Sequence, residues 1–122
     1  MNRDNKNIVM LYENAMQQPT MTADEGGTKW WRLNGKLHRE DGPAVEYENG
    51  YKAWFLNDVR HREDGPAVEW ADGSKSWYLR GSRYEDVFAW ARALLKMKGI
   101  KKPSEDQITD KVQQITSSSI LD

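Results

Sequence analysis

The chain has 122 residues, of which 38% are hydrophobic and 30% charged, with no cysteine and a formal net charge of −1 at neutral pH. This length allows one domain with at most a short appendage, and the low apolar content allows only a small or thin core. The absence of cysteine excludes disulfide scaffolds, thiolate metal sites and cysteine nucleophiles, and the near-zero charge argues against an overall electrostatic grip on nucleic acid.

The N-terminal segment, residues 1–29, is predicted to be a helix followed by a linker. Apolar residues at helical spacings predict an amphipathic helix over residues 4–18 that stops at Pro19. Its apolar stretch, residues 8–11, is too short for a secretion signal or a membrane span, so we expect a soluble protein of the cytoplasm with no membrane partner. Residues 19–29 are rich in Thr, Gly and charge and are expected to form a linker or disordered joint.

The middle of the chain is an internal repeat with a period of 23 residues. Residues 31–53 overlay residues 54–76, and both copies contain the block His-Arg-Glu-Asp-Gly-Pro-Ala-Val-Glu, at 38–46 and 61–69. A third, partial copy begins at Trp77. The chain therefore contains two full units and a fragment.

Each unit has the pattern of a β-hairpin. Segments of alternating polarity flank Asn49-Gly50 in one copy and Asp72-Gly73 in the other, and such pairs suit a tight type I′ turn. We therefore expect residues 30–84 to form a meandering antiparallel sheet of tandem hairpins.

The period-two alternation of strands sorts the side chains of this sheet into faces. It predicts an outward charged set, Glu46, Lys52, Glu69 and Lys75, and places Phe55, Tyr78 and Arg32 in a short strip on the face opposite the apolar one. The predicted inward apolar set is Trp31, Leu33, Val45, Tyr47, Trp54, Leu56, Val68, Trp70, Trp77 and Leu79.

The His-Arg-Glu-Asp-Gly-Pro part of each block links one hairpin to the next. Proline cannot donate to a strand ladder, and an Asp before Gly-Pro can accept backbone N–H groups, so the block predicts a rigid loop. The residues given a structural role in the repeat are His38, Asp41, Gly42, Pro43, His61, Asp64, Gly65, Pro66, Trp31, Trp54 and Trp77.

The two histidines, with the carboxylates beside them, are the only residues that resemble the acid–base set of an enzyme. Successive copies step along a sheet by one hairpin, which places His38 and His61 roughly 10 Å apart. That separation is too large for shared metal ligation, so we expect no catalytic activity, no metal and no cofactor. Ligand contact and catalysis are the weaker alternatives for these residues.

The C-terminal segment, residues 85–122, is predicted to be a helical cap. Ser82-Arg83-Tyr84-Glu85 has the form of a capping box and precedes an apolar stripe that ends near Gly99. A second capping pattern at 104–107 precedes a thinner stripe, which predicts a helix that docks weakly or binds something else. The two helices are expected to cap the sheet and cover its apolar face, so the predicted fold class is α+β.

Two sets of residues are candidates for partner contact. Aromatic residues on the face of the sheet opposite the predicted apolar set indicate an exposed patch. A run of basic residues lies at the end of the first C-terminal helix and after it. Cations near a helix C-terminus are favourable toward the helix dipole, and the alternative is a site for phosphate or an acidic partner. The candidates are Trp30, Phe55, Tyr78, Arg92, Lys96, Lys98, Lys101 and Lys102.

The repeat unit, Trp-x-Leu-Asn followed by His-Arg-Glu-Asp-Gly-Pro-Ala and closed by Asn/Asp-Gly, resembles the MORN-like (membrane occupation and recognition nexus) repeats of bacteriophages and giant viruses. The similarity covers residues 30 to 88. The resemblance implies a single-layer antiparallel sheet of successive hairpins, which has no catalytic activity and serves as a binding surface. The chain departs from the usual Asn-Gly at Asn57-Asp58 and Arg80-Gly81, and its array is short, so it needs caps at its ends.

The resemblance and the lack of a converging catalytic set predict a non-enzymatic protein-binding module. The specific expectation is a phage-encoded inhibitor of a host defence protein, such as an anti-CRISPR, that acts by occlusion in the bacterial cytoplasm. One alternative is a nucleic-acid or nucleotide binder that uses the basic run with Trp30 and Tyr78. Another is a virion or self-assembling protein, including a homodimer, that pairs through an open edge strand.

Overall fold

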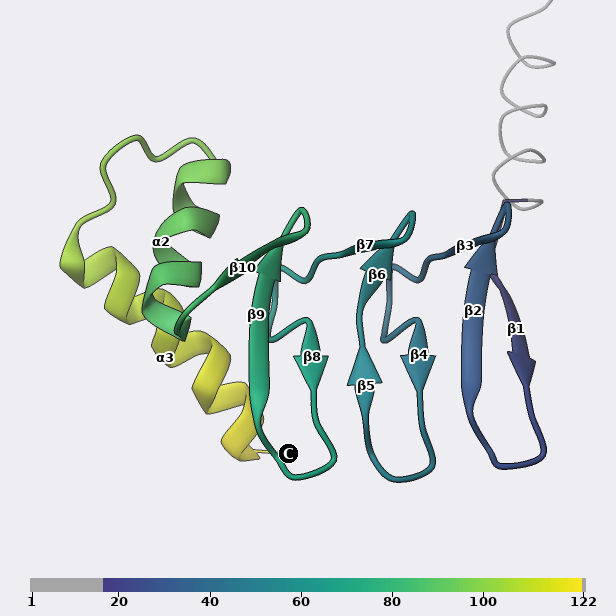
Figure 1. Ribbon diagram of the computed structural model, residues 1–122. Coiled ribbons are helices and arrows are strands. Elements are labelled where there is room, and N and C mark those ends of the chain that lie inside the picture. The colour runs from purple at the N-terminus through teal and green to yellow at the C-terminus, as the bar shows by residue number, and fades with distance from the viewer. Residues whose placement is uncertain (1–16, 122) are drawn as a thin grey trace, which may run out of the picture.

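The computed structural model describes residues 17–121, with side chains described for residues 17–116. It shows an antiparallel sheet followed by two helices, which confirms the predicted α+β class (Figure 1). The helix predicted over residues 4–18 falls almost entirely outside the described residues.

The strands are short and follow one another in hairpin order. The helices are α2 (Val87–Met97) and α3 (Glu105–Leu121). The strands are β1 (Thr20–Ala23), β2 (Lys29–Leu33), β3 (Lys36–Leu37), β4 (Val45–Glu46), β5 (Lys52–Ala53), β6 (Phe55–Leu56), β7 (Val59–Arg60), β8 (Val68–Glu69), β9 (Lys75–Leu79) and β10 (Ser82–Tyr84).

The sheet is an array of three hairpins, β1–β2, β4–β5 and β8–β9, which lie side by side in Figure 1. Consecutive hairpins join through the same antiparallel register, because Trp30 pairs with Val45 and Ala53 pairs with Val68. Short ribbons, β2–β3, β6–β7 and β9–β10, close one end of each hairpin. The sequence repeat is therefore also a repeat of strand pairing.

The prediction of a linker over residues 19–29 was wrong, because this segment begins with β1 and forms a hairpin with β2. The turn of this hairpin is closed by the Thr28 N–H, which donates to Asp24 Oδ1 at 2.9 Å. All four residues of β1 are exposed at the edge of the sheet. An edge strand with no buried side chain has the composition of a linker, so its polarity concealed it.

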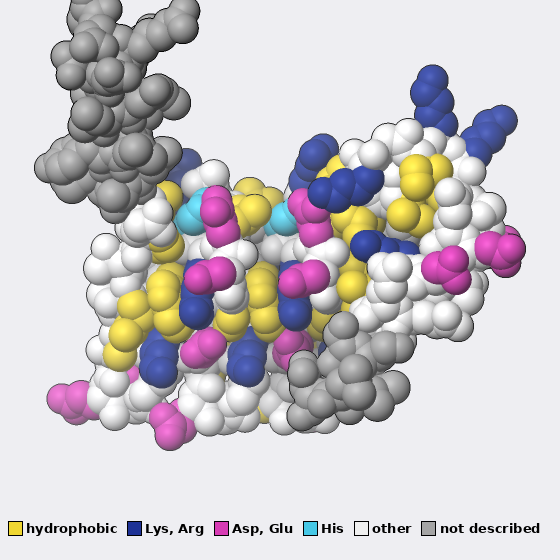
Figure 2. Space-filling view, turned by 180° about the vertical axis from the view of Figure 1, so that it is seen from behind, with side chains coloured by type: hydrophobic (Ala, Val, Ile, Leu, Met, Phe, Trp, Pro, Cys, Tyr) yellow, Lys and Arg dark blue, Asp and Glu magenta, His cyan; other side chains and the backbone are white. Residues whose placement is uncertain are grey.

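The two faces of the sheet carry different chemistry. The front face, which carries the row Trp30, Val45, Ala53, Val68 and Ser76, is largely apolar. The back face carries the adjacent row Lys29, Glu46, Lys52, Glu69 and Lys75, in which the charge alternates from strand to strand. Figure 2 shows the back face, where dark blue and magenta side chains alternate across the sheet.

The predicted inward set was therefore wrong, since it mixed the two faces. Val45 and Val68 lie on the front, whereas Trp54 lies on the back with Lys52, two positions before it in the same strand phase. The antiparallel register places Ala53, and not Trp54, opposite Val45. Adjacent tryptophans such as Trp30 and Trp31 point to opposite faces for the same reason.

The two helices pack on the back of the last hairpin and do not cover the apolar front face, which corrects a further expectation. The larger core cluster joins helix residues Trp90, Leu94 and Ile108 to Leu79 of β9. Helix α3, expected to dock weakly, packs on α2 through Ile108, Val112 and Ile115. The front face forms its own small core from Val45, Ala53 and Val68 under aromatic side chains.

The caps of the helices agree with the sequence at one of two sites. Helix α3 begins with the predicted capping box, in which Ser104 Oγ accepts from the Gln107 N–H and Gln107 Oε1 accepts from the Ser104 N–H. The box predicted at Ser82 was wrong, because Ser82–Tyr84 forms β10. Asp86 is the N-cap of α2, and its Oδ1 accepts from the Ala89 N–H at 2.8 Å.

Candidate interaction surfaces

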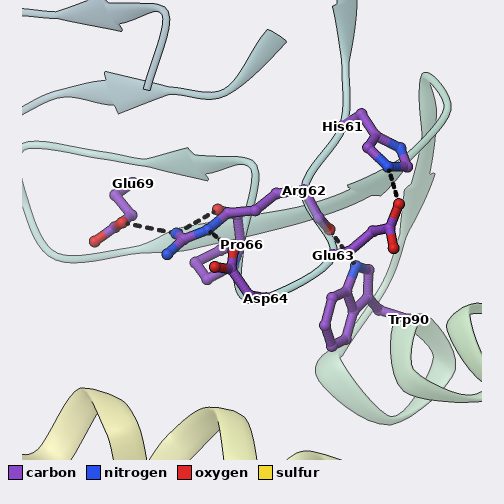
Figure 3. Close-up of polar contacts among 7 residues, drawn as sticks. All are labelled: His61, Arg62, Glu63, Asp64, Pro66, Glu69 and Trp90. Carbon is purple, nitrogen blue, oxygen red and sulfur yellow. Dashed lines mark hydrogen bonds and ion pairs between the residues drawn. The ribbon is translucent and has the colours of Figure 1, made fainter. Parts of the chain in front are cut away.

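The repeated loops are held against the back face by an arginine in each full unit. Arg62 Cζ lies 3.8 Å from the centroid of the Trp54 ring, and its guanidinium donates to Asp64, to the Pro66 carbonyl and to Glu69 (Figure 3). These contacts satisfy the guanidinium on its edges and on one face. The arginine therefore ties loop, strand and tryptophan together within the unit.

The preceding unit repeats this arrangement 23 residues earlier. Arg39 Cζ lies 3.9 Å from the Trp31 ring, and Arg39 donates to Asp41 and to the Pro43 carbonyl. A Cβ added at Gly42 would lie 2.9 Å from Arg39 Cζ, so only glycine leaves room for the folded guanidinium. Gly65 stands equally close to Arg62, which gives these glycines a steric reason in both units.

The histidines fix the loops to the next hairpin. His38 Nδ1 accepts from the Asn57 N–H at 3.1 Å, and His61 Nδ1 accepts from the Arg80 N–H at 2.8 Å. Nδ1 can accept only as an unprotonated nitrogen, so the neutral imidazole carries its proton on Nε2. The acceptor use of Nδ1 leaves neither ring free to act as a base through that nitrogen.

Glu63 joins His61 to the end of α2 through a hydrogen bond with His61 and an ion pair with Lys98. His61 Nε2 lies 3.0 Å from Glu63 Oε2, and the same carboxylate is paired with Lys98 (Figure 3 shows the His61–Glu63 contact). The hydrogen bond from Lys98 is the largest cause that lowers the pKa of Glu63 below its usual value, and the bond with His61 is the next. In the preceding unit the corresponding His38–Glu40 distance is 3.8 Å, and Glu40 is mostly exposed.

Grooves lie between consecutive loops. One, of about 650 Å³, runs between residues 39–43 and residues 61–64 over Trp54 and Leu56. A similar groove of about 610 Å³ lies one unit earlier and contains His38, so the two histidines line different grooves. Among the described residues, no three His, Cys, Asp or Glu side chains are grouped as metal ligands would be. The described loops therefore form two separate grooves, of which the first is lined by both charged and apolar side chains.

The front face carries the most exposed aromatic cluster of the described sheet. The Tyr47 and Tyr51 rings lie 4.9 Å apart, and the Tyr51 and Trp70 rings lie 5.3 Å apart. Tyr47 is 45% exposed and Trp70 is 46% exposed, although both have large hydrophobic side chains. Figure 1 shows the two helices at the end of the sheet, beyond β9 and β10, so they leave this face open.

The predicted contact residues fall into two separate places. Trp30, Phe55 and Tyr78 share the front face, but they are half-buried and pack against Val45, Ala53 and Val68, so the freely exposed strip that was predicted is partly core. Phe55 and Tyr78 come together there with Arg60, which lies near both rings.

The basic run is divided by ion pairs. Arg92 pairs with Glu105 at 3.2 Å, and Lys98 pairs with Glu63. Lys96, Lys101 and Lys102 are exposed around the connection from α2 to α3, where the described residues provide them with no carboxylate partner. The run is therefore three free cations and two compensated ones.

Sequence reasoning missed the exposure of the front-face tyrosines and Trp70. Of the arginines at the strand ends it placed only Arg32 on the strip with Phe55 and Tyr78, and it missed Arg60 and Arg83. Tyr47 and Trp70 were assigned to the interior because they alternate in step with Val45 and Val68. All four lie on the front face, and because no described helix covers that face, the larger side chains near the turns are exposed. The signal that could have found them is the pairing of Trp30 with Val45, which identifies the face to which each phase belongs.

No helix in the described part of the chain is long and apolar enough to cross a membrane. Comparison with protein-family models, curated proteins and solved structures found no match to this chain.

Proposed function

We propose that this chain is a non-enzymatic protein-binding module that uses the front face of its sheet. The observation that carries the proposal is the aromatic cluster of Tyr47, Tyr51 and Trp70 on a face that no described helix covers, in which Tyr47 and Trp70 are about half exposed. Trp and Tyr are enriched among the residues that dominate binding energy at protein interfaces. Monomeric proteins rarely leave large apolar side chains together at the surface without a partner.

The resemblance of the units to viral repeat arrays supports the choice of partner class. We propose that the chain acts in a bacterial cytoplasm on a host defence protein, and that it inhibits this protein by covering part of its surface. The hydrogen-bonded sheet supports this mode of action, because a surface built on paired strands can cover a partner without ordering loops and so loses little conformational entropy on binding.

Capture from a bacterial host lysate tests the proposal. The wild-type chain and two matched variants serve as bait: Trp70→Ala on the front face and Phe88→Ala on α2, where Phe88 is 52% exposed. We expect Trp70→Ala to lose the captured protein by about 30-fold or more, as a central aromatic contact does, and Phe88→Ala to retain it. Thermal melts of each bait show whether the fold is kept.

Two outcomes contradict the proposal. One is that only nucleic acid co-purifies with the wild-type chain. The other is that Trp70→Ala and Phe88→Ala retain the same proteins in the same amounts, because the front face then contributes nothing.

A second candidate function, self-assembly, has its own observation. Strand β1 is exposed along all four residues, and β2 is its only neighbour in the described sheet. Unpaired edge strands pair with other chains. Light scattering over a wide concentration range tests this candidate: a mass that rises with concentration and falls back on Thr22→Lys supports it, and a constant monomer mass excludes it.

A further inference from the structure

Three arginines stand on the front face where the hairpins end. The strand register pairs Arg32 with Leu37, Arg60 with Phe55 and Arg83 with Tyr78. Cross-strand partners share a face, so each of the three short ribbons presents one arginine beside one apolar or aromatic side chain. We call Arg32, Arg60 and Arg83 the front arginine row.

The charge of this row is uncompensated. None of its arginines forms an ion pair with a described residue, whereas Arg39 and Arg62 on the back face each pair with two carboxylates. No described strand position that faces forward is Asp or Glu. The Nε of Arg60 is buried and has no acceptor among the described residues.

Aromatic rings hold two of the three guanidinium groups in place. Arg60 Cζ lies 5.3 Å from the Phe55 ring and 5.6 Å from the Tyr78 ring, and Arg32 Cζ lies 5.7 Å from the Trp30 ring. A guanidinium stacked on a ring still offers its N–H edge to a carboxylate, and it loses less side-chain freedom on binding than a free one.

We infer that the partner of the front face presents carboxylates to the front arginine row, with apolar side chains placed for the aromatic cluster at the other end of the same hairpins; this rests on the proposed function of that face. Arg60 and Arg83 are one repeat apart, which is about 10 Å for two strand spacings. Acidic residues seven apart on a helix, at about 1.5 Å per residue, match that step. Bidentate pairing with Arg makes such contacts specific as well as attractive.

A protein is favoured over a nucleic acid by the charge around the row. Residues 17–86 carry 10 Lys and Arg against 13 Asp and Glu, so the sheet as a whole repels a polyphosphate. The strand carboxylates, Glu46 and Glu69, lie on the back face and the others lie in turns and loops, whereas Arg32, Arg60 and Arg83 are the charged strand residues of the described front face.

Binding of two labelled probes, poly-L-glutamate and oligo(dT), measured by fluorescence anisotropy at low ionic strength, tests the inference. The test variant is Arg32→Gln/Arg60→Gln/Arg83→Gln, and the matched control is Lys96→Gln/Lys101→Gln/Lys102→Gln, which removes the same charge from the helical end. We expect the test variant to bind poly-L-glutamate about tenfold more weakly than wild type, because the contributions of three exposed charge pairs to binding add up to about that factor. We expect the control to bind nearly as well as wild type. Arg32→Gln/Arg83→Gln replaces the triple variant if Arg60→Gln lowers the melting temperature.

Equal losses in the two variants overturn the inference, because net charge alone then explains binding. It is also overturned if wild type binds oligo(dT) more tightly than poly-L-glutamate and the test variant loses that binding, since the row then serves a nucleic acid. Lysate capture separates this failure from that of the proposed function. A host protein lost on Trp70→Ala but retained on the arginine substitutions supports a protein-binding face and contradicts the acidic partner.

Discussion

Arg62 is the residue on which the last full unit most depends. Its side chain is 20% exposed, and its guanidinium stacks on Trp54 and donates to Asp64, the Pro66 carbonyl and Glu69. Removal of the side chain would leave a carbonyl and two carboxylates without their donor, and leaving such partners unsatisfied costs more than one exposed ion pair.

We expect Arg62→Ala to lower the free energy of unfolding by about 2–4 kcal/mol, from one cation–π contact and hydrogen bonds to charged groups. Urea denaturation measures this. Arg92→Ala is the control, because its pair with Glu105 is exposed and contributes less than about 1 kcal/mol. A loss for Arg62→Ala no larger than that of Arg92→Ala would contradict the structural role of the stacked arginine.

Glu63 makes the free energy of unfolding depend on pH in the acidic range. Its pKa is lowered by Lys98 and then by His61, so its folded pKa lies below its unfolded value. The stabilisation is fully present above the unfolded pKa, which is about 4.3 for a free Glu, and is lost as the pH falls through the folded pKa.

The stability advantage of wild type over Glu63→Gln should therefore be constant near neutral pH and disappear in strong acid. Denaturant titrations at a series of pH values measure it. Glu40→Gln, the equivalent change one unit earlier, should show a smaller dependence, because Glu40 is 83% exposed and lies 3.8 Å from His38. The same acid dependence for both substitutions would show that Lys98 is not the cause.

At the residue scale the sequence predicted turns better than contacts. The hairpins turn at Asn49-Gly50 and Asp72-Gly73 as predicted, but the predicted type I′ form was wrong. The Gly50 N–H donates to the Tyr47 carbonyl and the Gly73 N–H to the Trp70 carbonyl, and only the two glycines of these pairs are left-handed, with φ values of 99° and 91°. The stacking of Arg39 on Trp31 was not predictable, since it depends on the path of the loop between them. The face of each tryptophan also needed the strand register, which a sequence pattern does not contain.

Helix α2 is the element that ends the array. Trp90 is fully buried, its ring lies 5.0 Å from the Trp77 ring, and its Nε1–H donates to the Arg62 carbonyl at 3.3 Å. Trp31 and Trp54 are stacked by arginines, whereas Trp77 in the third copy is contacted by Trp90 of the helix. The helix therefore seals the last unit with an apolar contact.

We expect Trp90→Ala to lower the free energy of unfolding by about 3–5 kcal/mol, as removal of a buried aromatic side chain does. Hydrogen exchange should show protection lost first in α2 and α3. Phe88→Ala on the exposed side of the same helix should change stability by about 0.5 kcal/mol or less. Retention of exchange protection in α2 after Trp90→Ala would contradict its role as the cap.

The elements with strong periodicity were predicted, and the short ones were not. Helix α2 was predicted from its apolar stripe, and its end at Met97 agrees with Gly99, whose φ is 104°. β10 was missed because three exposed or half-buried residues leave no apolar pattern, and Ser82 suggested a helix cap instead. The absence of a layer over the front face was also unpredictable, since it depends on which side of β9 the helices pack.

At the scale of the whole described chain, the sheet is a linear array in which each hairpin contacts its neighbours. The registers that join β2 to β4 and β5 to β8 are the same, so one junction can follow another. In such arrays stability is close to the sum of unit and junction contributions.

A chain with a second copy of residues 31–53 inserted after Ala53 should therefore fold as a soluble monomer. Its urea m-value should rise by about a fifth, in proportion to the added surface, with no loss in melting temperature. Urea denaturation and light scattering measure these changes. Aggregation of the inserted chain, or a melting temperature well below that of wild type, would show that the units depend on their particular neighbours.

The identical junctions between hairpins also bear on inheritance. Because one junction is equivalent to the next, a gene that gains or loses a whole 23-residue unit by recombination would keep its reading frame, its terminal helices and its fold. Descendants of such a gene would differ in the length of the sheet and share its chemistry, so copy number would be the quantity on which selection acts when a target changes in size.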